Sequence, residues 1–136
     1  MADTVVTLRW LGEGLKFESE ASGGITVPID GDGEAGSRPM ELLLIGLAGC
    51  MGIDIVDIVH KMRVELEGLD VRVEGDRAPE PPRRYTRIRL AYEARGVAEE
   101  DLPKLQRAVD LSEEKYCSVL HTLRQDIELE TEIRLS

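Results

Sequence analysis

The chain has 136 residues and a formal net charge of −10, because 27 Asp and Glu outnumber 17 Lys and Arg. Proteins that bind nucleic acids or anionic membranes present clustered Lys and Arg, so this balance argues against both classes of partner. With 42% hydrophobic and 32% charged residues, the composition is that of a soluble globular protein. The length suits a single domain over residues 1–136.

The first residues, Met-Ala-Asp-Thr, lack the basic start and apolar run of a secretory signal. The longest apolar run, Leu42 to Ile53, is shorter than the about 20 residues that a membrane-spanning helix needs. We therefore expect a cytoplasmic protein without a membrane segment. In that reducing compartment Cys50 and Cys117 are not expected to form a structural disulfide. Each is then either a buried small hydrophobe or a functional thiol.

The N-terminal part predicts a three-stranded antiparallel meander. Its segments are rich in β-branched residues or alternate between apolar and polar residues, and glycine-containing turns separate them. The predicted strands are 4–11, 15–20 and 25–29. The loop 30–37 (DGDGEAGS) has the composition of a calcium loop but not its spacing or its terminal Glu, so no metal is expected there.

A long helix is predicted over 38–63. Ser37 can cap it, Pro39 suits its first turn, and Glu41 complements the helix dipole. The first half of the segment is apolar on all sides, which is typical of a helix buried all round. Because such a helix is too long and too apolar for a monomer of this size to cover, we predict a homodimer.

The remainder predicts two strands joined by a proline-rich turn, then two helices and a final strand. Asp101 is expected to cap the first of these helices. The strands are 69–74, 86–95 and 127–135, and the helices begin at 101 and 116. The resulting order, βββ-α-ββ-αα-β, predicts an α+β fold with a long buried central helix.

Cys50 lies in the apolar half of the central helix, beside Gly46 and Gly49. A glycine inside a helix costs roughly 1 kcal/mol against alanine, so this pair indicates that another backbone or a substrate approaches closely. Cys117 follows Lys115 near the start of a short helix, and both a helix N-terminus and a cation lower the pKa of a thiol. The sequence separation of the two cysteines does not show whether they meet, and either one alone more often simply packs.

Four more polar residues are candidates for the same site. Asp54, one helical turn after the first cysteine, could orient an arginine or histidine, whereas Asp57 more simply marks a solvated face. His121 shares a helix face with the second cysteine and could activate its thiol. A zinc site made of both cysteines, His60 and His121 has no supporting spacing, so no metal is expected.

Four arginines lie in the predicted hairpin formed by strands 69–74 and 86–95, in its turn and its second strand. They are Arg83, Arg84, Arg87 and Arg89. We expect this basic patch to balance acidic neighbours in the same hairpin.

The two cysteines lie in two motifs whose combination is specific. The first runs Arg38-Pro39-Met40-Glu41-Leu42-Leu43-Leu44 and then Gly46-Leu47-Ala48-Gly49-Cys50, and the second is Tyr116-Cys117-Ser118-Val119. Their sequences and spacing resemble the OsmC/Ohr family of osmotically induced and organic hydroperoxide resistance proteins. The element order also matches, so the resemblance covers essentially the whole chain, and it points to a divergent OsmC-like member.

The resemblance implies an intertwined homodimer, with two long central helices wrapped by sheets from both chains. It also implies a thiol peroxidase that reduces organic hydroperoxides in oxidative stress defence without metal, haem or other cofactor. Cys50 would be the peroxidatic thiolate, oxidised to a sulfenic acid, and Cys117 would resolve it as a disulfide. A dithiol reductant, a dihydrolipoyl group in some members, would reopen that bond.

The chain departs from the family pattern at one point. The best-known members carry a Glu directly after the Pro, where it orients an Arg onto the reactive thiolate. Here that position is Met40, and Glu41 follows about 100° further round the helix. Glu41, with Arg38 or Arg9 as the arginine, completes the candidate catalytic set. The alternative hypothesis is a non-enzymatic dimer that kept the fold and binds a small apolar ligand.

Overall fold

The computed structural model describes residues 2–21 and 23–136, which form two compact units, Met1–Leu43 and Leu44–Ser136. The first unit is built on an antiparallel sheet in the order β1-β2-β3. Its strands are β1 (Thr7–Trp10), β2 (Lys16–Glu20) and β3 (Thr26–Asp30). The predicted meander is therefore confirmed, while the single domain 1–136 stays a prediction.

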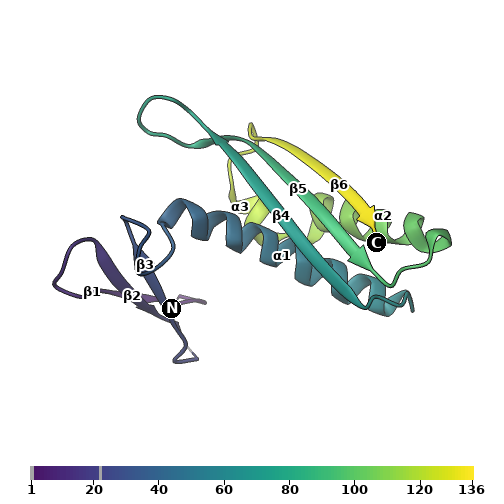
Figure 1. The fold of residues 1–136 in the computed structure, drawn as a ribbon, viewed down its shortest axis with the longest axis horizontal. Helices are drawn as coiled ribbons and strands as arrows, with labels where there is room; N and C mark the ends of the chain where they lie inside the picture. The colour runs from purple at the N-terminus through teal and green to yellow at the C-terminus, as the bar shows by residue number, and fades with distance from the viewer. Residues whose placement is uncertain (1, 22) are drawn as a thin grey trace. The chain divides into compact units, whose positions relative to one another are not determined.

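The second unit holds most of the central helix and a sheet in the order β4-β5-β6 (Figure 1). The elements are α1 (Pro39–Lys61), β4 (Gly68–Arg77), β5 (Tyr85–Arg95), α2 (Leu102–Leu111), α3 (Ser118–Thr122) and β6 (Glu128–Leu135). β4 runs antiparallel to β5, whereas β6 runs parallel to it. A parallel pair needs a crossover connection, which α2 and α3 supply. The α+β fold and the order βββ-α-ββ-αα-β are confirmed.

The start of α1 differs from the prediction. The backbone N–H of Arg38 donates to Glu41 Oε1 at 2.9 Å, so the residue that precedes the helix is Arg38 and Glu41 forms half of a capping box. The backbone carbonyl of Ser37 instead accepts the N–H of Asp30 at 3.1 Å. Asp101 precedes α2, but its side chain makes no capping hydrogen bond. The predictions that Ser37 and Asp101 cap these helices are wrong.

The core of the second unit lies between α1 and one face of its sheet. Residues of α1 spaced four apart are fully or almost fully buried: Leu47, Met51, Ile55 and Val59. Alternate residues of β5 are equally buried: Ile88, Leu90, Tyr92 and Ala94. The Tyr92 hydroxyl donates to Met51 Sδ at 3.4 Å, which ties the two layers together. Each of the buried Leu, Ile, Val and Met side chains contributes about 1.5–3 kcal/mol to folding.

The remaining surface of α1 is apolar but uncovered among the described residues. Ile45 is 55% exposed, Ile53 71% and Val56 47%. An 18-residue window of the helix has a mean hydropathy of 2.2, and 22% of it is buried. By length and composition alone the helix could cross a membrane, contrary to the estimate from its longest apolar run, although core helices of soluble proteins pass the same test. Burial on all sides stays a prediction about the dimer.

The C-terminus of α1 places Arg63 in the left-handed region, at φ 60°. The N–H of Val64 donates to the carbonyl of Val59 at 2.9 Å, so the chain turns back as in a Schellman motif. Glycine is the residue that takes this conformation without a steric penalty.

Replacing Arg63 by glycine is therefore expected to stabilise the protein by about 0.5–1 kcal/mol, since relief of the left-handed strain exceeds the entropy that glycine adds to the unfolded chain. Urea unfolding followed by circular dichroism measures the change. Arg63→Ala is the control, because alanine keeps the strain and should not stabilise. A less stable Arg63→Gly protein would contradict this account of the turn.

Candidate active site

Cys50 and Cys117, far apart in the sequence, meet in the second unit. Cys50 is half-buried on α1, whereas Cys117 is completely buried just before α3. The Cys50 side chain is close enough to contribute to the raised pKa of Cys117, and both are free thiols. The structure thus brings together the two residues that the sequence singled out, with one open to a reactant and the other shielded.

The backbone around Cys117 holds its thiol in place from two directions. The residue caps α3, because its Sγ accepts the N–H of Leu120 at 3.3 Å. Its own N–H donates to the carbonyl of Ser112 at 2.8 Å and closes the π-helical turn Ser112–Tyr116. Such turns insert a residue into a helix and are frequent at functional sites. The sequence predicted the short helix but not this turn.

The pKa of Cys117 moves opposite to the prediction. Burial raises the pKa of this thiol to about 11, and the N–H of Leu120 lowers it only partly. The hydrogen bond with Cys50 and the charges of Cys50 and Asp54 raise it further. Lys115 lies 5.5 Å from the ring centroid of Tyr116, in a cation–π contact. The expectation that a helix N-terminus and Lys115 together lower this pKa is therefore wrong, because desolvation dominates.

Asp54 takes part in the site, but with a partner that the sequence did not indicate. Its Oδ2 accepts the hydroxyl of the fully buried Ser112 at 2.8 Å. The hypothesis that Asp54 orients an arginine or histidine is replaced by this contact. Asp57 is exposed and pairs with Lys61 at 2.9 Å, as expected for the solvated face. A serine at the end of a surface helix carries no sequence signal for such a role.

Tyr92 of β5 lies near Cys117 on the side of the site that faces the sheet. The sequence did not identify it as a site residue. Its side chain is fully buried, and burial raises its pKa, with smaller contributions from the charges of Cys117 and Glu113. Burial likewise raises the pKa of Glu113, helped by the neighbouring acids Asp110 and Glu114. Cys117, Tyr92 and Glu113 therefore all have a raised pKa, with burial as the largest cause for each.

The two histidines do not join the cysteines. His121 Nε2 lies 3.0 Å from the carbonyl oxygen of Glu113, so its ring faces that carbonyl and not the thiol. His60 is exposed near the end of α1. In the part of the chain that the structure describes, no group of three or more His, Cys, Asp and Glu could hold a metal ion. The four-residue zinc arrangement is not formed.

The three remaining candidates, Arg9, Arg38 and Glu41, belong to the first unit. Glu41 accepts the backbone N–H of Arg38, and the guanidinium of Arg38 donates to the carbonyl of Asp32 at 2.9 Å. Arg9 is exposed on β1, opposite Glu18 in the sheet register. The hydrogen bonds of Glu41 and Arg38 at the start of α1 give both side chains a structural role. A catalytic role for Arg9, Arg38 or Glu41 stays a prediction.

An open apolar groove of about 820 Å³ runs between α1 and β4. Ile45, Ile53 and Val56 line it from the helix, and Leu69, Val71 and Val73 line it from the strand. Gly49, next to Cys50, is also part of its wall. Among the described residues, apart from the chain neighbours and the nearby helix backbone, no atom lies within 4 Å of the position that a Cβ would take on Gly46 or Gly49. The second unit therefore does not supply the close approach that the sequence predicts at these glycines, and that approach stays a prediction.

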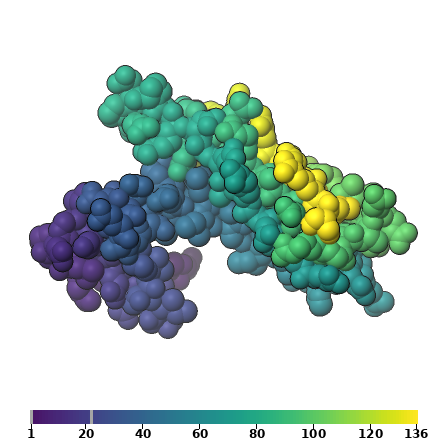
Figure 2. Space-filling view, in the orientation of Figure 1, coloured from purple at the N-terminus to yellow at the C-terminus, as the bar shows by residue number. Residues whose placement is uncertain are grey.

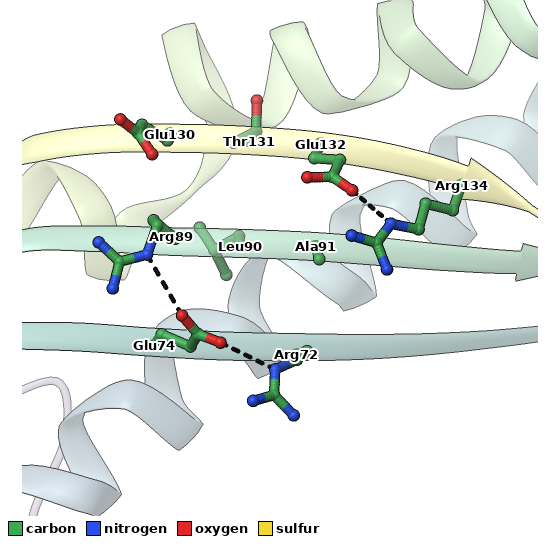
Figure 3. A pocket seen from close by; sticks show the side chains of 9 residues that line it. All are labelled: Arg72, Glu74, Arg89, Leu90, Ala91, Glu130, Thr131, Glu132 and Arg134. Carbon is green, nitrogen blue, oxygen red and sulfur yellow. Dashed lines mark hydrogen bonds and ion pairs between the residues drawn. The ribbon is translucent and has the colours of Figure 1, made fainter.

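A second groove, of about 540 Å³, lies on the opposite, charged face of the sheet (Figure 3). In Figure 2 the strand β6, drawn in yellow, lies on the face turned to the viewer, and its side chains alternate between exposed and half-buried. This face is distinct in character from the thiol site, since ion pairs and not apolar side chains dominate it.

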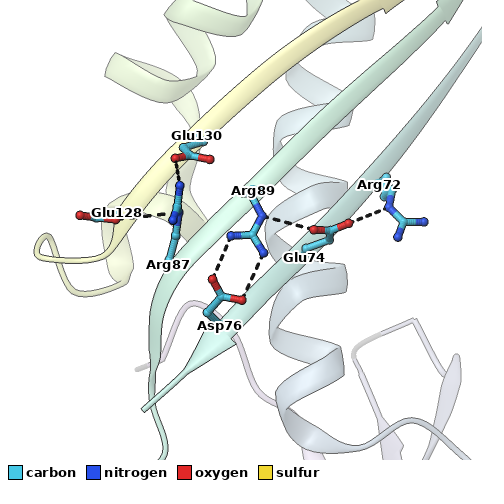
Figure 4. A network of polar contacts seen from close by, with 7 residues as sticks. All are labelled: Arg72, Glu74, Asp76, Arg87, Arg89, Glu128 and Glu130. Atoms are coloured by element: carbon cyan, nitrogen blue, oxygen red, sulfur yellow. Dashed lines mark hydrogen bonds and ion pairs between the residues drawn. The ribbon is translucent and has the colours of Figure 1, made fainter. Parts of the chain in front are cut away.

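The arginines of this face are paired with acids (Figure 4). Arg89 bonds both Asp76, at 2.9 Å, and Glu74, at 3.2 Å, while Arg87 pairs with Glu130. The prediction that these arginines balance acidic neighbours in the same hairpin is confirmed for Arg89, whereas Arg87 pairs with acids of β6, outside that hairpin. Exposed pairs of this kind contribute about 0–1 kcal/mol each, and the face needs no ligand to account for its charges.

With this geometry the chain can be assigned to a family. The OsmC-like protein family matches residues 31–132, and the chain belongs to that family. The curated relative YhfA of Escherichia coli K12 is 37% identical over 123 residues, which cover 90% of both chains. The resemblance to OsmC-like proteins is thereby confirmed.

Solved structures agree with this assignment. A hypothetical protein from Aquifex aeolicus VF5 is 33% identical, with a TM-score of 0.86 over 100% of this chain and 98% of that one. The organic hydroperoxide resistance protein OhrB of Bacillus subtilis has a TM-score of 0.62 at 17% identity, over 99% and 98% of the two chains. At that identity the likeness shows a shared fold.

The two thiols are expected to react with iodoacetamide at very different rates at pH 8. Cys117 is buried, and with a pKa of about 11 only roughly one thiol in a thousand is the reactive thiolate at that pH. Timed alkylation followed by peptide mass spectrometry should therefore show Cys50 modified first. Equal labelling of both cysteines in urea is the control. Faster labelling of Cys117 in the folded protein would contradict its burial.

Proposed function

We propose that this protein is a cysteine-based peroxidase that reduces organic hydroperoxides and contributes to oxidative stress defence. The observation that carries the proposal is the meeting of a half-exposed Cys50 with a buried Cys117. Proteins of the same fold from Legionella pneumophila and Elizabethkingia anophelis are named organic hydroperoxide resistance proteins. That name supports the reaction class, and the residues of this chain supply the steps.

Cys50 acts first because its side chain is the more accessible of the two. Its thiolate attacks one oxygen of the hydroperoxide, an S–O bond forms and the O–O bond breaks. The sulfur loses two electrons and becomes a sulfenic acid. The leaving alkoxide takes up a proton and departs as the alcohol, so no metal or organic cofactor is required.

Cys117 completes the second step. Its thiol gives up a proton as its sulfur attacks the sulfur of the Cys50 sulfenic acid. An S–S bond forms, the S–O bond breaks, and the departing hydroxide leaves with that proton as water. The shielded position and raised pKa of Cys117 keep it protonated until this step, so peroxide does not oxidise it directly.

A dithiol reductant then restores both cysteines by thiol–disulfide exchange and becomes a disulfide itself. We place this cycle in the cytoplasm, where dithiols are kept reduced. An organic hydroperoxide is the substrate class that the names of the neighbours with this fold indicate.

We further propose that the protein acts as a homodimer. A second copy of the chain would cover the apolar face of α1 that contains Ile45, Ile53 and Val56. Contiguous apolar surface of this kind marks interaction sites in soluble proteins. Because Gly46 and Gly49 have no side chains, the helix leaves room there for the backbone of the second copy to approach.

The proposed reaction predicts different outcomes for the two cysteine variants. With cumene hydroperoxide and a dithiol, wild type should consume peroxide continuously, whereas Cys50→Ser should show only the rate of the buffer. In an assay without dithiol, Cys117→Ser retains the first step and should consume about one equivalent and accumulate the Cys50 sulfenic acid, because no intramolecular thiol can convert it to a disulfide. Peroxide loss is followed by a ferrous-iron colour assay. Equal slow rates in wild type and Cys50→Ser would refute peroxidase activity.

The dimer predicts that Ile53→Glu halves the molar mass measured by light scattering after gel filtration. A carboxylate on the apolar face must otherwise be desolvated in the interface, which is costly without a partner. Arg134→Glu, which places the same charge on the outer face of the sheet, should leave the wild-type mass unchanged. A monomeric wild type that retains an apolar molecule in native mass spectrometry would favour the alternative, a non-enzymatic binding protein.

A further inference from the structure

The hydrogen bond between Asp54 and Ser112 joins α1 to the segment that leads into Cys117. Asp54 lies one helical turn after Cys50, so the two side chains share a face of α1. Ser112 begins the π-helical turn before Cys117 and is completely buried. Its hydroxyl donates to Asp54 Oδ2 at 2.8 Å. This contact links residues that are widely separated in the sequence and flank both cysteines.

Ser112 is connected to Cys117 through its backbone as well. The N–H of Cys117 donates to the carbonyl of Ser112 at 2.8 Å. A continuous chain of hydrogen bonds therefore runs from the Asp54 carboxylate through Ser112 to the backbone of Cys117. The Cys50 thiol is also near, since it contributes to the raised pKa of Cys117. The helix that carries the first cysteine thus holds the turn that presents the second.

The other hydrogen bond at the Cys117 side chain does not do what the Asp54–Ser112 bond does. The Leu120 N–H sets the position of the Cys117 sulfur relative to α3, but it does not attach α3 to α1. The Asp54–Ser112 bond does attach the turn to α1, at one end of the π-helical segment. The side-chain oxygen of Asp54 accepts the Ser112 hydroxyl, and because Ser112 is completely buried this bond restricts both partners.

We propose that Asp54 and Ser112 are positioning residues that hold Cys117 in register with Cys50 and so set how readily the two sulfurs join in a disulfide. The inference rests on the proposed function in one respect, that the two cysteines exchange electrons as a pair. It adds residues that the sequence and the OsmC/Ohr resemblance did not assign to this role. Neither residue touches the peroxide in this proposal, and both act through Cys117.

The test measures the thiol–disulfide equilibrium of the cysteine pair and needs no hydroperoxide. Wild type and variants are equilibrated in mixtures of reduced and oxidised dithiothreitol, quenched with acid, alkylated and weighed by mass spectrometry. Two protein thiols become a disulfide as oxidised dithiothreitol takes up their two electrons and two protons. Asp54→Ala and Ser112→Ala should each lower the equilibrium constant for disulfide formation by about tenfold, because a loosened turn lowers the effective concentration of one thiol at the other.

Two further variants separate positioning from other roles. Asp54→Asn keeps an oxygen that accepts the Ser112 hydroxyl, so its equilibrium constant should stay within about threefold of wild type, although the charge is gone. Asp57→Ala removes an exposed acid of the same helix and should leave the constant unchanged. Urea unfolding of each protein shows whether the fold survives, and Asp54→Asn provides the comparison if an alanine variant does not fold.

The outcomes distinguish this inference from the peroxidase proposal. Wild-type constants in both Asp54→Ala and Ser112→Ala would overturn it, and so would a wild-type chain that forms no disulfide between Cys50 and Cys117. A constant for Asp54→Asn as low as that for Asp54→Ala would overturn the positioning role in favour of a charge effect. If the constants change as expected while cumene hydroperoxide is not consumed, the peroxidase proposal fails and the positioning role stands.

Discussion

The burial of one stripe of α1 against the inner face of the sheet determines most of what the second unit can do. Met51 and Ile55 are fully buried in that stripe, and the Tyr92 hydroxyl bonds the sulfur of Met51. Because burial of such side chains stabilises the fold by about 1.5–3 kcal/mol each, the helix cannot rotate freely about its axis. Cys50 and Asp54 each precede a stripe residue by one position, so the same packing directs both toward the segment that carries Cys117.

The chemistry of the thiol pair follows from what surrounds it. Burial, the Cys50 thiol and the nearby Asp54 charge raise the pKa of Cys117 and favour its neutral form. Among the described residues, the groups that act on its pKa are the Leu120 N–H, the Cys50 thiol and the Asp54 carboxylate. This environment separates the two cysteines into an accessible sulfur and a shielded one, which is the division of labour that the proposed peroxidase cycle needs. The positioning role proposed for Asp54 and Ser112 belongs to the second of these sulfurs.

The two faces of the second unit's sheet differ because their side chains satisfy different requirements. On the outer face, arginines such as Arg87 and Arg89 find acidic partners on neighbouring strands, so the charges are balanced within the chain. On the inner side, the groove beside α1 keeps Ile53 and Val56 exposed, and nothing in the second unit's described residues offsets that cost. The uncovered apolar area is the physical reason to expect a second copy of the chain at α1 and not at the outer face of the sheet.

The sequence alone determined the order of strands and helices, because alternation and helical periodicity are local properties that side-chain burial then enforces. It also singled out Cys50 and Cys117 through two motifs. Tertiary structure alone decided that the two thiols meet, that β6 joins β5 in parallel, and that Asp54 pairs with Ser112. It also reversed the expected shift in the pKa of Cys117, since desolvation depends on how many atoms cover a thiol and not on its place at a helix start. Contacts between distant segments leave no periodic signature in a single chain, which is why only the folded molecule reveals them.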